Sequence, residues 1–265
     1  MPRIYSPQTL QADAEVTLDA AAARHVQVLR KQPGDALTLF NGQGGEYEAQ
    51  VSHMGRGEVR VRVGAHAAVE RELPCAVHIA MGVPANERME WLVEKATELG
   101  VASIQPLMVE RSVLRLAGER ADKKVAHWQA IAAAACEQSG RNRVPTVHAV
   151  KNLAQWLALT AVTFSPTAPS PSPSPAPSPP SVSTSKHHYL LSLSPQASTL
   201  AKLLGTGPQP PKLHFLSGPE GGLSAAEEQL AVNAGFAALS LGPRVLRAET
   251  APLSVLSCVA LWSPI

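Results

Sequence analysis

The sequence predicts an α/β protein in which a small N-terminal β-barrel precedes a larger domain built on a parallel sheet. Three observations lead to this fold class. Short strands follow one another closely in the first quarter of the chain, strands and helices alternate after Pro74, and residues 250–265 carry no charge. The chain has 265 residues, 45% of them hydrophobic, which suffices for one large or two small cores. We therefore expect two domains, residues 1–73 and 74–265.

The N-terminal domain is expected to consist mainly of strands. Its elements are, in order, a helix over 19–30 with Asp19 as its N-cap and strands over 35–40, 46–51 and 58–63. A glycine-rich turn, 41–45, joins the first two strands. In the last strand, Val59, Val61 and Val63 alternate with arginines, which predicts that the valines pack inward and the arginines face solvent. Short strands at this spacing favour a small barrel.

The C-terminal domain is expected to alternate strands and helices. Its elements are strand 76–81, helix 86–99, strand 101–109, helix 121–139, strand 189–193, a helix, strand 213–216, helix 225–234, strand 238–241 and helix 251–261. In the clearest of them, apolar side chains from Met89 to Leu99 recur on one helix face and Gly100 ends the helix. This alternation indicates a parallel sheet.

Composition excludes several classes of function. Lys plus Arg number 23 and Asp plus Glu 21, so the chain has no strongly basic coat for nucleic acid, although a local basic patch is compatible with these numbers. The scattered Cys75, Cys136 and Cys258 form neither a disulfide framework nor a zinc site. No apolar run reaches the roughly 18 residues of a membrane span, and the first residues lack the apolar segment of a signal peptide. We expect a cytoplasmic protein with no metal and no membrane partner.

Residues 165–185 interrupt the second domain with eight prolines and eight serines in 21 positions, and they carry no charge. Such a segment buries too little apolar surface to offset its ordering entropy, so an extended loop is expected. It is either a proline-rich ligand for a partner or a tolerated surface insertion. We favour the insertion, because long loops cost little to close.

Three loops contain residue types that bind ligands. The first, Gly218-Pro-Glu-Gly-Gly222, joins a strand to a helix, where backbone N–H groups gather around a ligand. Ser224 and Glu227 form a capping box that fixes the helix start. The glycine spacing matches neither the dinucleotide nor the P-loop pattern, and Glu220 would repel phosphate. A ligand with hydroxyl groups or positive charge fits better, and a structural glycine turn is the alternative.

The second loop, 239–252, concentrates its charge in Arg244, Arg247 and Glu249, immediately before an uncharged helix. The Gly242-Pro243 pair ends the strand before it. A solvated linker rarely places all its charge at such a point. We therefore favour a functional loop over a charged linker.

The third loop, 137–143, follows the alanine-rich helix. Arg141 and Arg143 have the chemistry to hold a phosphate or a base edge of RNA. Cations at a helix C-terminus also offset the helix dipole. The residues alone leave both interpretations open.

Four motifs occur together and in order: Lys95-Ala-Thr-Glu-Leu-Gly-Val101, Ala135-Cys-Glu-Gln-Ser-Gly-Arg-Asn-Arg143, Gly218-Pro-Glu-Gly-Gly-Leu223 and Leu241-Gly-Pro-Arg-Val-Leu-Arg-Ala-Glu-Thr250. Together they resemble the ribosomal RNA small subunit methyltransferase E family. The opening Pro2-Arg-Ile-Tyr5 and the segment 25–30 fit the N-terminal part of that family. The resemblance thus covers nearly the whole chain.

The resemblance implies an N-terminal PUA-like barrel and a C-terminal SPOUT domain whose sheet ends in a trefoil knot. It also implies methylation of N3 of a uridine in the 16S rRNA of the small ribosomal subunit, with S-adenosylmethionine as donor. In-line methyl transfer mainly requires alignment, and a guanidinium can stabilise the charge that develops on the uracil oxygens. Arg247 is the first candidate for that role and Arg244 the second, whereas Glu249 or Glu220 accepts the proton or orients the donor.

The same resemblance suggests which residues bind each substrate. The donor site is expected to include Leu191, Leu193, Leu216, Gly218, Pro219, Glu220, Gly221, Leu241, Gly242, Leu246, Thr250 and Ala251. The RNA is expected to contact Arg3, Arg24, Arg30, Arg60, Arg62, Arg141 and Arg143.

The uncharged C-terminal helix predicts a homodimer. Leu253, Leu256 and Val259 fall on one face, with Val255 and Trp262 near the other side. We expect one monomer to cover only one side of this helix and a second copy to cover the rest. Arg141 or Arg143 would then reach the partner's donor.

Two other classes of protein remain as alternatives. One is a non-catalytic RNA-binding protein with a degenerate donor pocket. The other is a nucleotide-binding α/β enzyme, which the missing dinucleotide and P-loop signatures disfavour.

Overall fold

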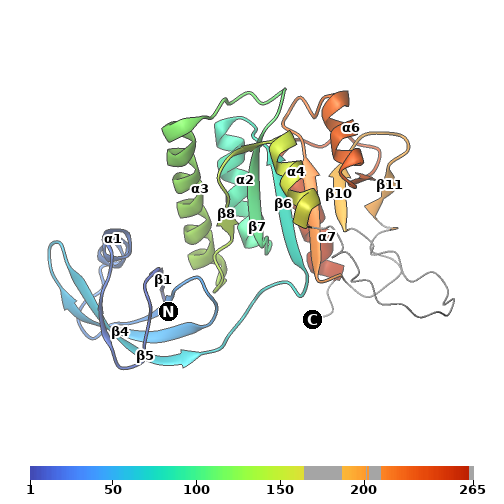
Figure 1. Cartoon of the computed structure of the whole chain (residues 1–265). Coiled ribbons are helices and arrows are strands. Elements are labelled where there is room, and N and C mark those ends of the chain that lie inside the picture. Colours follow the sequence, from blue (N-terminus) through green and yellow to red (C-terminus); the bar gives the residue numbers. More distant parts are fainter. Residues whose placement is uncertain (164–186, 201, 203–209, 263–265) are drawn as a thin grey trace, which may run out of the picture.

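The computed structural model describes residues 1–163, 187–200, 202 and 210–262. Two domains follow one another along the chain, a smaller N-terminal one and a larger C-terminal one (Figure 1). The proline- and serine-rich segment, 165–185, lies outside the described residues, as does most of the helix expected after strand 189–193.

The N-terminal domain is a curved five-stranded sheet with one helix (Figure 1). Its elements are β1 (Arg3–Tyr5), β2 (Glu15–Thr17), α1 (Ala20–Val28), β3 (Ala36–Phe40), β4 (Glu46–Met54) and β5 (Val59–Ala67). The strand order is β1-β3-β4-β5-β2, with β1 and β3 parallel and the other pairs antiparallel. As predicted, the Asp19 side chain caps α1 by accepting from the backbone N–H groups of Ala21 and Ala22.

The alternation of valine and arginine in β5 builds this domain's core. Val59, Val61 and Val63 are fully buried with Leu37 and other apolar side chains of the sheet and α1. The arginines between the valines point away from this core, and Arg62 is exposed. The predicted facing of the strand is therefore confirmed.

The C-terminal domain contains an eight-stranded sheet. Its elements are β6 (Ala76–Gly82), α2 (Asn86–Glu98), β7 (Ser103–Met108), α3 (Gly118–Ser139), β8 (Thr146–Val147), β9 (Lys151–Asn152), α4 (Leu153–Thr163), β10 (His188–Leu191), β11 (Ser198–Thr199), β12 (Lys212–Ser217), α6 (Ala225–Asn233), β13 (Ala237–Ser240) and α7 (Thr250–Trp262). The strand order is β11-β13-β10-β12-β6-β7-β8, and β9 also pairs with β7. Every pairing among these described strands is parallel, as predicted.

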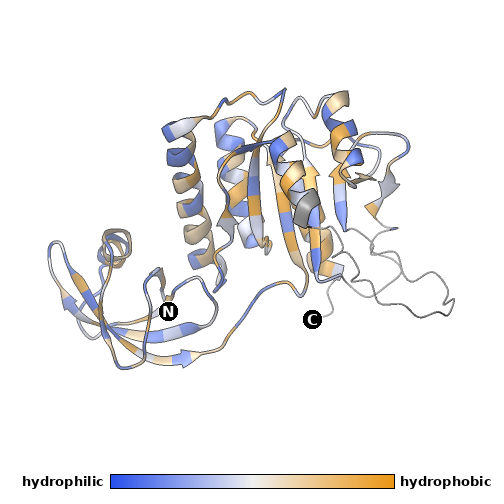
Figure 2. Ribbon diagram, viewed as in Figure 1, coloured by the Kyte–Doolittle hydropathy of each residue, from blue (hydrophilic) through white to orange (hydrophobic). Residues whose placement is uncertain are grey.

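Helices cover both faces of this sheet. On one face of the sheet, side chains of α2, α3 and α7 pack with those of the strands in one core. On the other face, side chains of α4 and α6 pack with those of the strands in a second core. The central strands are predominantly hydrophobic (Figure 2), as expected for parallel strands buried on both faces. Among the described residues, no helix has the length and apolarity needed to cross a membrane.

Several boundaries differ from the sequence prediction. The helix α3 begins three residues before the expected Ala121, and β10 ends at Leu191 rather than Leu193. The prediction missed α4, the three-residue strands β1 and β2, and the two-residue strands β8, β9 and β11. Such short strands are defined by their neighbours in the sheet and leave almost no local pattern.

The expectation for the C-terminal helix is wrong in one respect. We expected one monomer to cover a single side of α7, yet Leu253, Val255, Leu256 and Val259 are all buried within the described chain. The reason is that α7 contacts both α2 and β12, so two sides of the helix are covered by its own domain.

Three histidines form a row across the sheet. His188, His214 and His78 are register partners on the neighbouring strands β10, β12 and β6. Ring centroids are 4.6 Å apart for His78 and His214 and 4.7 Å apart for His188 and His214. Burial, followed by the nearby His78, His188 and Lys212, lowers the pKa of His214 to about 3.

We expect His214→Phe, which keeps an aromatic ring in the row, to reduce the acid sensitivity of the fold. An unfolded histidine binds a proton below about pH 6.5, whereas folded His214 stays neutral down to about pH 3. The unfolded state then holds more protons, so the free energy of unfolding falls as the pH drops through this window. We expect urea titrations at pH 7.5 and 5.0 to show that the free energy of unfolding falls by about 1–2 kcal/mol less in the variant than in the wild type.

His53, exposed on β4, supplies the control. His53→Gln should lose as much stability on acidification as the wild type. If the wild type and both variants lose the same free energy of unfolding on acidification, protonation of His214 on unfolding does not contribute to the acid sensitivity.

Candidate active site

A cavity of about 320 Å³ lies at the carboxyl ends of β10, β12 and β13. The chain runs from β10 to β12 on one side and then to β13 on the other, so the loops after these strands diverge around the cavity. Ligands of open parallel sheets bind at such a point. The cavity is lined by Arg111, Leu191, Ser192, Leu193, Ser217, Gly218, Pro219, Glu220, Gly221, Gly222, Leu223, Glu228, Leu239, Leu241, Gly242, Arg244, Val245, Leu246, Arg247, Ala248 and Ala251.

Most of the predicted donor-site residues line this cavity. The exceptions are Leu216, which is fully buried below it in the core, and Thr250, which begins α7. Arg244 and Arg247, the predicted catalytic cations, are exposed and lie on the wall. The loops after β10, β12 and β13 therefore meet at one cavity, whereas the 137–143 loop does not line it.

In the loop after β12, residues 218–222, the backbone at Gly218 lies very close to the backbone at Gly222 and Leu223. A Cβ added at Gly218 would lie 2.7 Å from the backbone carbon of Gly222 and 2.7 Å from the backbone nitrogen of Leu223. Gly222 has a φ of +69°, which side-chain-bearing residues rarely adopt. The loop then enters α6 through the predicted capping box, in which Ser224 and Glu227 exchange hydrogen bonds.

The loop after β13 forms another wall of the cavity, and this loop is anchored on the start of α7. The backbone carbonyl of Arg247 accepts hydrogen bonds from the N–H groups of Thr250 (3.0 Å) and Ala251 (3.2 Å). This fixes the Cα of Arg247, while its side chain remains exposed at the cavity.

Glu249 is not where the sequence analysis placed it. Its side chain is buried and does not line the cavity, and Oε2 has no hydrogen-bond partner among the described residues. Arg88 Nη1 lies 3.8 Å from that oxygen and Arg88 Nε lies 3.6 Å from Glu220 Oε1. Of the two carboxylates expected to act in catalysis, Glu220 lines the cavity and Glu249 does not, and the catalytic role of either stays a prediction.

Two residues missed by the sequence analysis position the first loop. A Cβ at Gly82, at the end of β6, would lie 2.6 Å from Pro219 Cδ, so glycine is needed for the loop to approach the strand. Arg111 Nη1 donates to the carbonyl of Gly221 at 2.8 Å. The glycine at the end of a buried strand was the available signal for Gly82, but nothing local marks Arg111.

Comparison with known proteins shows the family of the chain. Residues 71–260 match the RNA methyltransferase domain, and residues 18–64 match the RNA methyltransferase PUA domain. The ribosomal RNA small subunit methyltransferase E of Bacillus subtilis is 32% identical over 89% of this chain and 85% of its own length. The chain belongs to this RNA methyltransferase family.

Solved structures extend the similarity to three dimensions. The ribosomal RNA small subunit methyltransferase E of Neisseria gonorrhoeae, solved bound to S-adenosyl methionine, has a TM-score of 0.82 and 33% identity, covering 97% of this chain and 96% of its own. A Legionella pneumophila protein, in complex with the bound cofactor SAM, has a TM-score of 0.83 and 34% identity over 98% and 96% of the two chains.

The arginines considered for RNA in this methyltransferase fall into two groups. Arg3 and Arg141 are largely buried in ion pairs with Glu46 and Glu72. Contact of either guanidinium with RNA would require breaking those pairs, and their predicted RNA-binding role stays a prediction. The other candidates are at least partly exposed: Arg24, Arg30, Arg60, Arg62 and Arg143.

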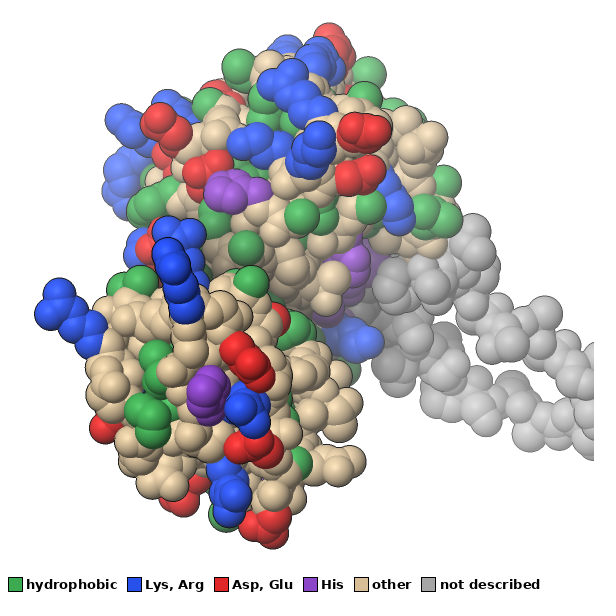
Figure 3. All heavy atoms as spheres, turned by 90° about the vertical axis from the view of Figure 1, so that its left-hand side faces the viewer, with side chains coloured by type: hydrophobic (Ala, Val, Ile, Leu, Met, Phe, Trp, Pro, Cys, Tyr) green, Lys and Arg blue, Asp and Glu red, His purple; other side chains and the backbone are tan. Residues whose placement is uncertain are grey.

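On the face of the described residues drawn in Figure 3, the exposed cations do not make one continuous basic surface. On the side shown in Figure 3, Lys and Arg side chains are interspersed with Asp and Glu over both domains. Arg60 lies 3.2 Å from both Glu15 and Glu58, and Arg143 lies 3.0 Å from Glu70.

Proposed function

We propose that the protein transfers a methyl group from S-adenosylmethionine to N3 of a uridine in the 16S rRNA of the small ribosomal subunit. The three-loop cavity carries this proposal, since it joins a glycine cradle to two exposed arginines in a chain of this family. The Neisseria gonorrhoeae relative, solved bound to S-adenosyl methionine, supports the choice of donor. We place residues 1–73 on the RNA and residues 74–265 around the donor, in the cytoplasm with the ribosome.

The cavity suits this donor chemically. Leu191, Leu241 and Leu246 provide apolar wall, and the glycine loop lets backbone groups come close to a ligand. Glu220 places a carboxylate on the cavity wall, and its Oε1 accepts a hydrogen bond from the N–H of Ala85 at 2.9 Å. About 320 Å³ is within the range of small-molecule sites.

The chain's own residues would prepare the uracil for attack. The donor supplies an electrophilic methyl group, which leaves sulfur as it bonds to N3. The N3 proton must go to a base, and we assign this to Glu220 because it is the predicted carboxylate on the cavity wall. Arg247, with Arg244 as the second candidate, would stabilise the negative charge on O2 and O4.

Direct analysis of the product tests this function. Purified protein, S-adenosylmethionine and small subunits from cells lacking the enzyme should yield 3-methyluridine at one position of 16S rRNA, detected by mass spectrometry of nuclease fragments. A methyl group on another atom or base would overturn the assigned specificity. A non-catalytic RNA-binding protein predicts no product and no heat on calorimetric titration with the donor.

We further propose that the C-terminal sheet is knotted. After β13 the chain crosses back past β10, and α7 then packs against β12 and α2. This path is compatible with the trefoil knot that the family resemblance implies, in which the chain end passes through an earlier connection, an exception among folds.

We also propose a homodimer, assembled through apolar residues that the monomer leaves exposed. Leu261 near the end of α7 is 87% exposed, and Val245 on the cavity wall is 78% exposed. Leu261→Glu should yield monomers by light scattering, because an unpaired charge is costly to bury at an interface. Leu256 cannot serve for this test, since it is fully buried in its own domain. Leu159→Glu, 55% exposed on α4, is the control, and a monomeric wild type would exclude the dimer.

A further inference from the structure

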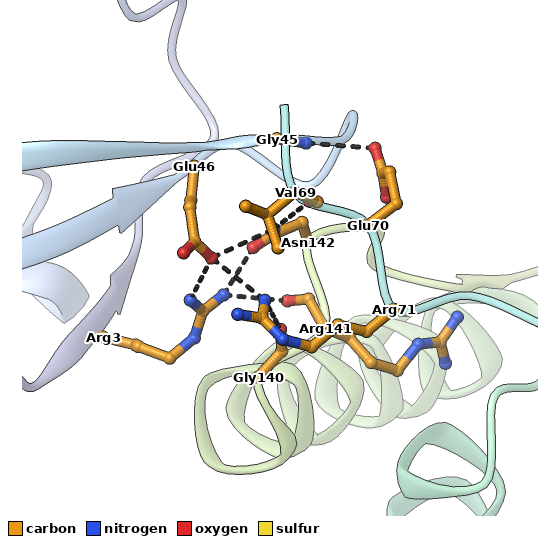
Figure 4. Close-up of polar contacts among 9 residues, drawn as sticks. All are labelled: Arg3, Gly45, Glu46, Val69, Glu70, Arg71, Gly140, Arg141 and Asn142. Atoms are coloured by element: carbon orange, nitrogen blue, oxygen red, sulfur yellow. Dashed lines mark hydrogen bonds and ion pairs between the residues drawn. The ribbon is translucent and has the colours of Figure 1, made fainter. Parts of the chain in front are cut away.

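The third loop singled out in the sequence lies at the seam between the two domains. Asn142 Nδ2 donates to the carbonyl of Val69 and, at 3.1 Å, to Glu46 Oε2. Arg3, on the first strand of the N-terminal domain, donates to Glu46 at 2.6 Å and to the Asn142 side-chain oxygen. Figure 4 shows these side chains converging from the two domains and from the segment that connects them.

The segment connecting the domains is held at four consecutive residues, 69–72. The carbonyl of Val69 accepts from Asn142, and Glu70 accepts from the Gly45 N–H and from Arg143. Arg71 donates to the carbonyl of Gly140 at 2.8 Å and to Glu46 at 3.1 Å. Glu72 receives two hydrogen bonds from Arg141, whose Nη1 also donates to the carbonyl of Thr97 at 2.8 Å.

Backbone hydrogen bonds reinforce the same seam. The N–H of Gly44 donates to the carbonyl of Asn142 at 3.1 Å, and the N–H of Val144 donates to the carbonyl of Gly42 at 3.2 Å. The N–H of Tyr5 donates to Glu137 Oε1 at 2.7 Å. Motion between domains is the default where the connecting segment is free, but here the segment and both flanking turns are bonded to each other.

The negative charge of Glu46, at the centre of the seam, is compensated by Arg3 and Arg71. Burial alone would raise the pKa of Glu46, but hydrogen bonds from Arg71, Arg3 and Asn142 lower it to about 2. Glu46 is thus ionised at neutral pH and holds three donors from separate segments together. Opening the seam would break all three of these hydrogen bonds to an ionised carboxylate, which are stronger than bonds between neutral groups.

From these contacts we infer that the 140–143 turn is a positioning element for the RNA substrate, with Asn142 at its centre. It fixes the N-terminal domain, and any RNA bound there, at a constant distance from the donor cavity. This inference rests on the proposed RNA methylation. A fixed separation aligns base and donor without a search through domain orientations, and small misplacements of reacting groups are costly to rate.

Asn142→Ala and Glu46→Gln test this role. Both variants should lower kcat/KM for the small ribosomal subunit by about tenfold or more, while the affinity for S-adenosylmethionine stays within about twofold of the wild type. Hydrogen exchange at the amides of Gly44 and Val144 should accelerate, while the amides of β6 stay protected. Lys123→Ala removes an exposed pair with Glu119 on the same helix and should change none of these values.

The outcomes separate the inference from the proposed function. Unchanged kinetics despite faster exchange at the seam would overturn the positioning role, as would a parallel loss of donor affinity and β6 protection. If exchange at the seam also stays slow in both variants, Asn142 and Glu46 do not hold it closed and the inference fails. If the wild-type protein methylates no uridine, both the proposed function and this positioning role are refuted. Hydrogen exchange at the amides of Gly44 and Val144 would still measure how rigid the seam is.

Discussion

Gly218→Ala should weaken binding of S-adenosylmethionine by about a hundredfold or more while the chain remains folded. The added methyl group would lie 2.7 Å from two backbone atoms of the loop itself, at Gly222 and Leu223. Backbone atoms in a tight turn cannot move aside as a flexible side chain can, so the loop must change shape. Because this loop forms one wall of the cavity, the expected loss is in donor binding, measured by calorimetry.

Gly221→Ala is the matched control in the same loop. Its added Cβ would lie 3.2 Å from Arg111 Cβ and 3.3 Å from Arg111 Cδ, a milder approach than the 2.7 Å contacts at Gly218, and we expect less than a tenfold loss. Thermal unfolding should show both variants folded. Wild-type affinity in Gly218→Ala would mean that the loop tolerates the methyl group and does not shape the donor site.

Arg247→Ala should reduce kcat by about a hundred- to a thousandfold, the range found when a group stabilising developing charge is removed. Donor affinity should change little, because the backbone carbonyl that anchors the loop to α7 is retained. Raising the pH should restore part of the rate, since the uracil imide then ionises without help from the guanidinium. Single-turnover assays with small ribosomal subunits measure the effect.

Arg115→Ala provides the comparison for this substitution. Arg115 is also exposed, but its guanidinium donates to the carbonyls of Val109 and Glu110 and does not line the cavity. Its loss should leave kcat within about twofold. If Arg247→Ala raises only the KM for RNA, or if Arg244→Ala alone lowers kcat, the assignment of Arg247 is wrong.

The sequence by itself determined features that depend on neighbouring residues. The Asp19 cap, the valine face of β5 and the capping box at Ser224 are each set by side chains within a few positions of one another. Two of the three cavity loops, 218–222 and 239–252, were also found from sequence, because glycine at a strand end and charge before an apolar helix are local patterns. The third, at Leu191 and Leu193, was expected only from the family resemblance. Their meeting at one edge follows from the parallel sheet, which the alternation of elements predicts.

The tertiary structure alone decided which charged residues are buried and with what partners. Arg141 and Arg143 are two positions apart, yet one is buried against Glu72 and the other is half exposed beside Glu70. Glu249 lies behind the cavity wall although Arg247, in the same loop, lies on it. Gly82 is needed because Pro219, distant in sequence, packs on it. These outcomes depend on contacts between segments far apart in the chain, and local sequence contains no record of which segment will cover a given side chain.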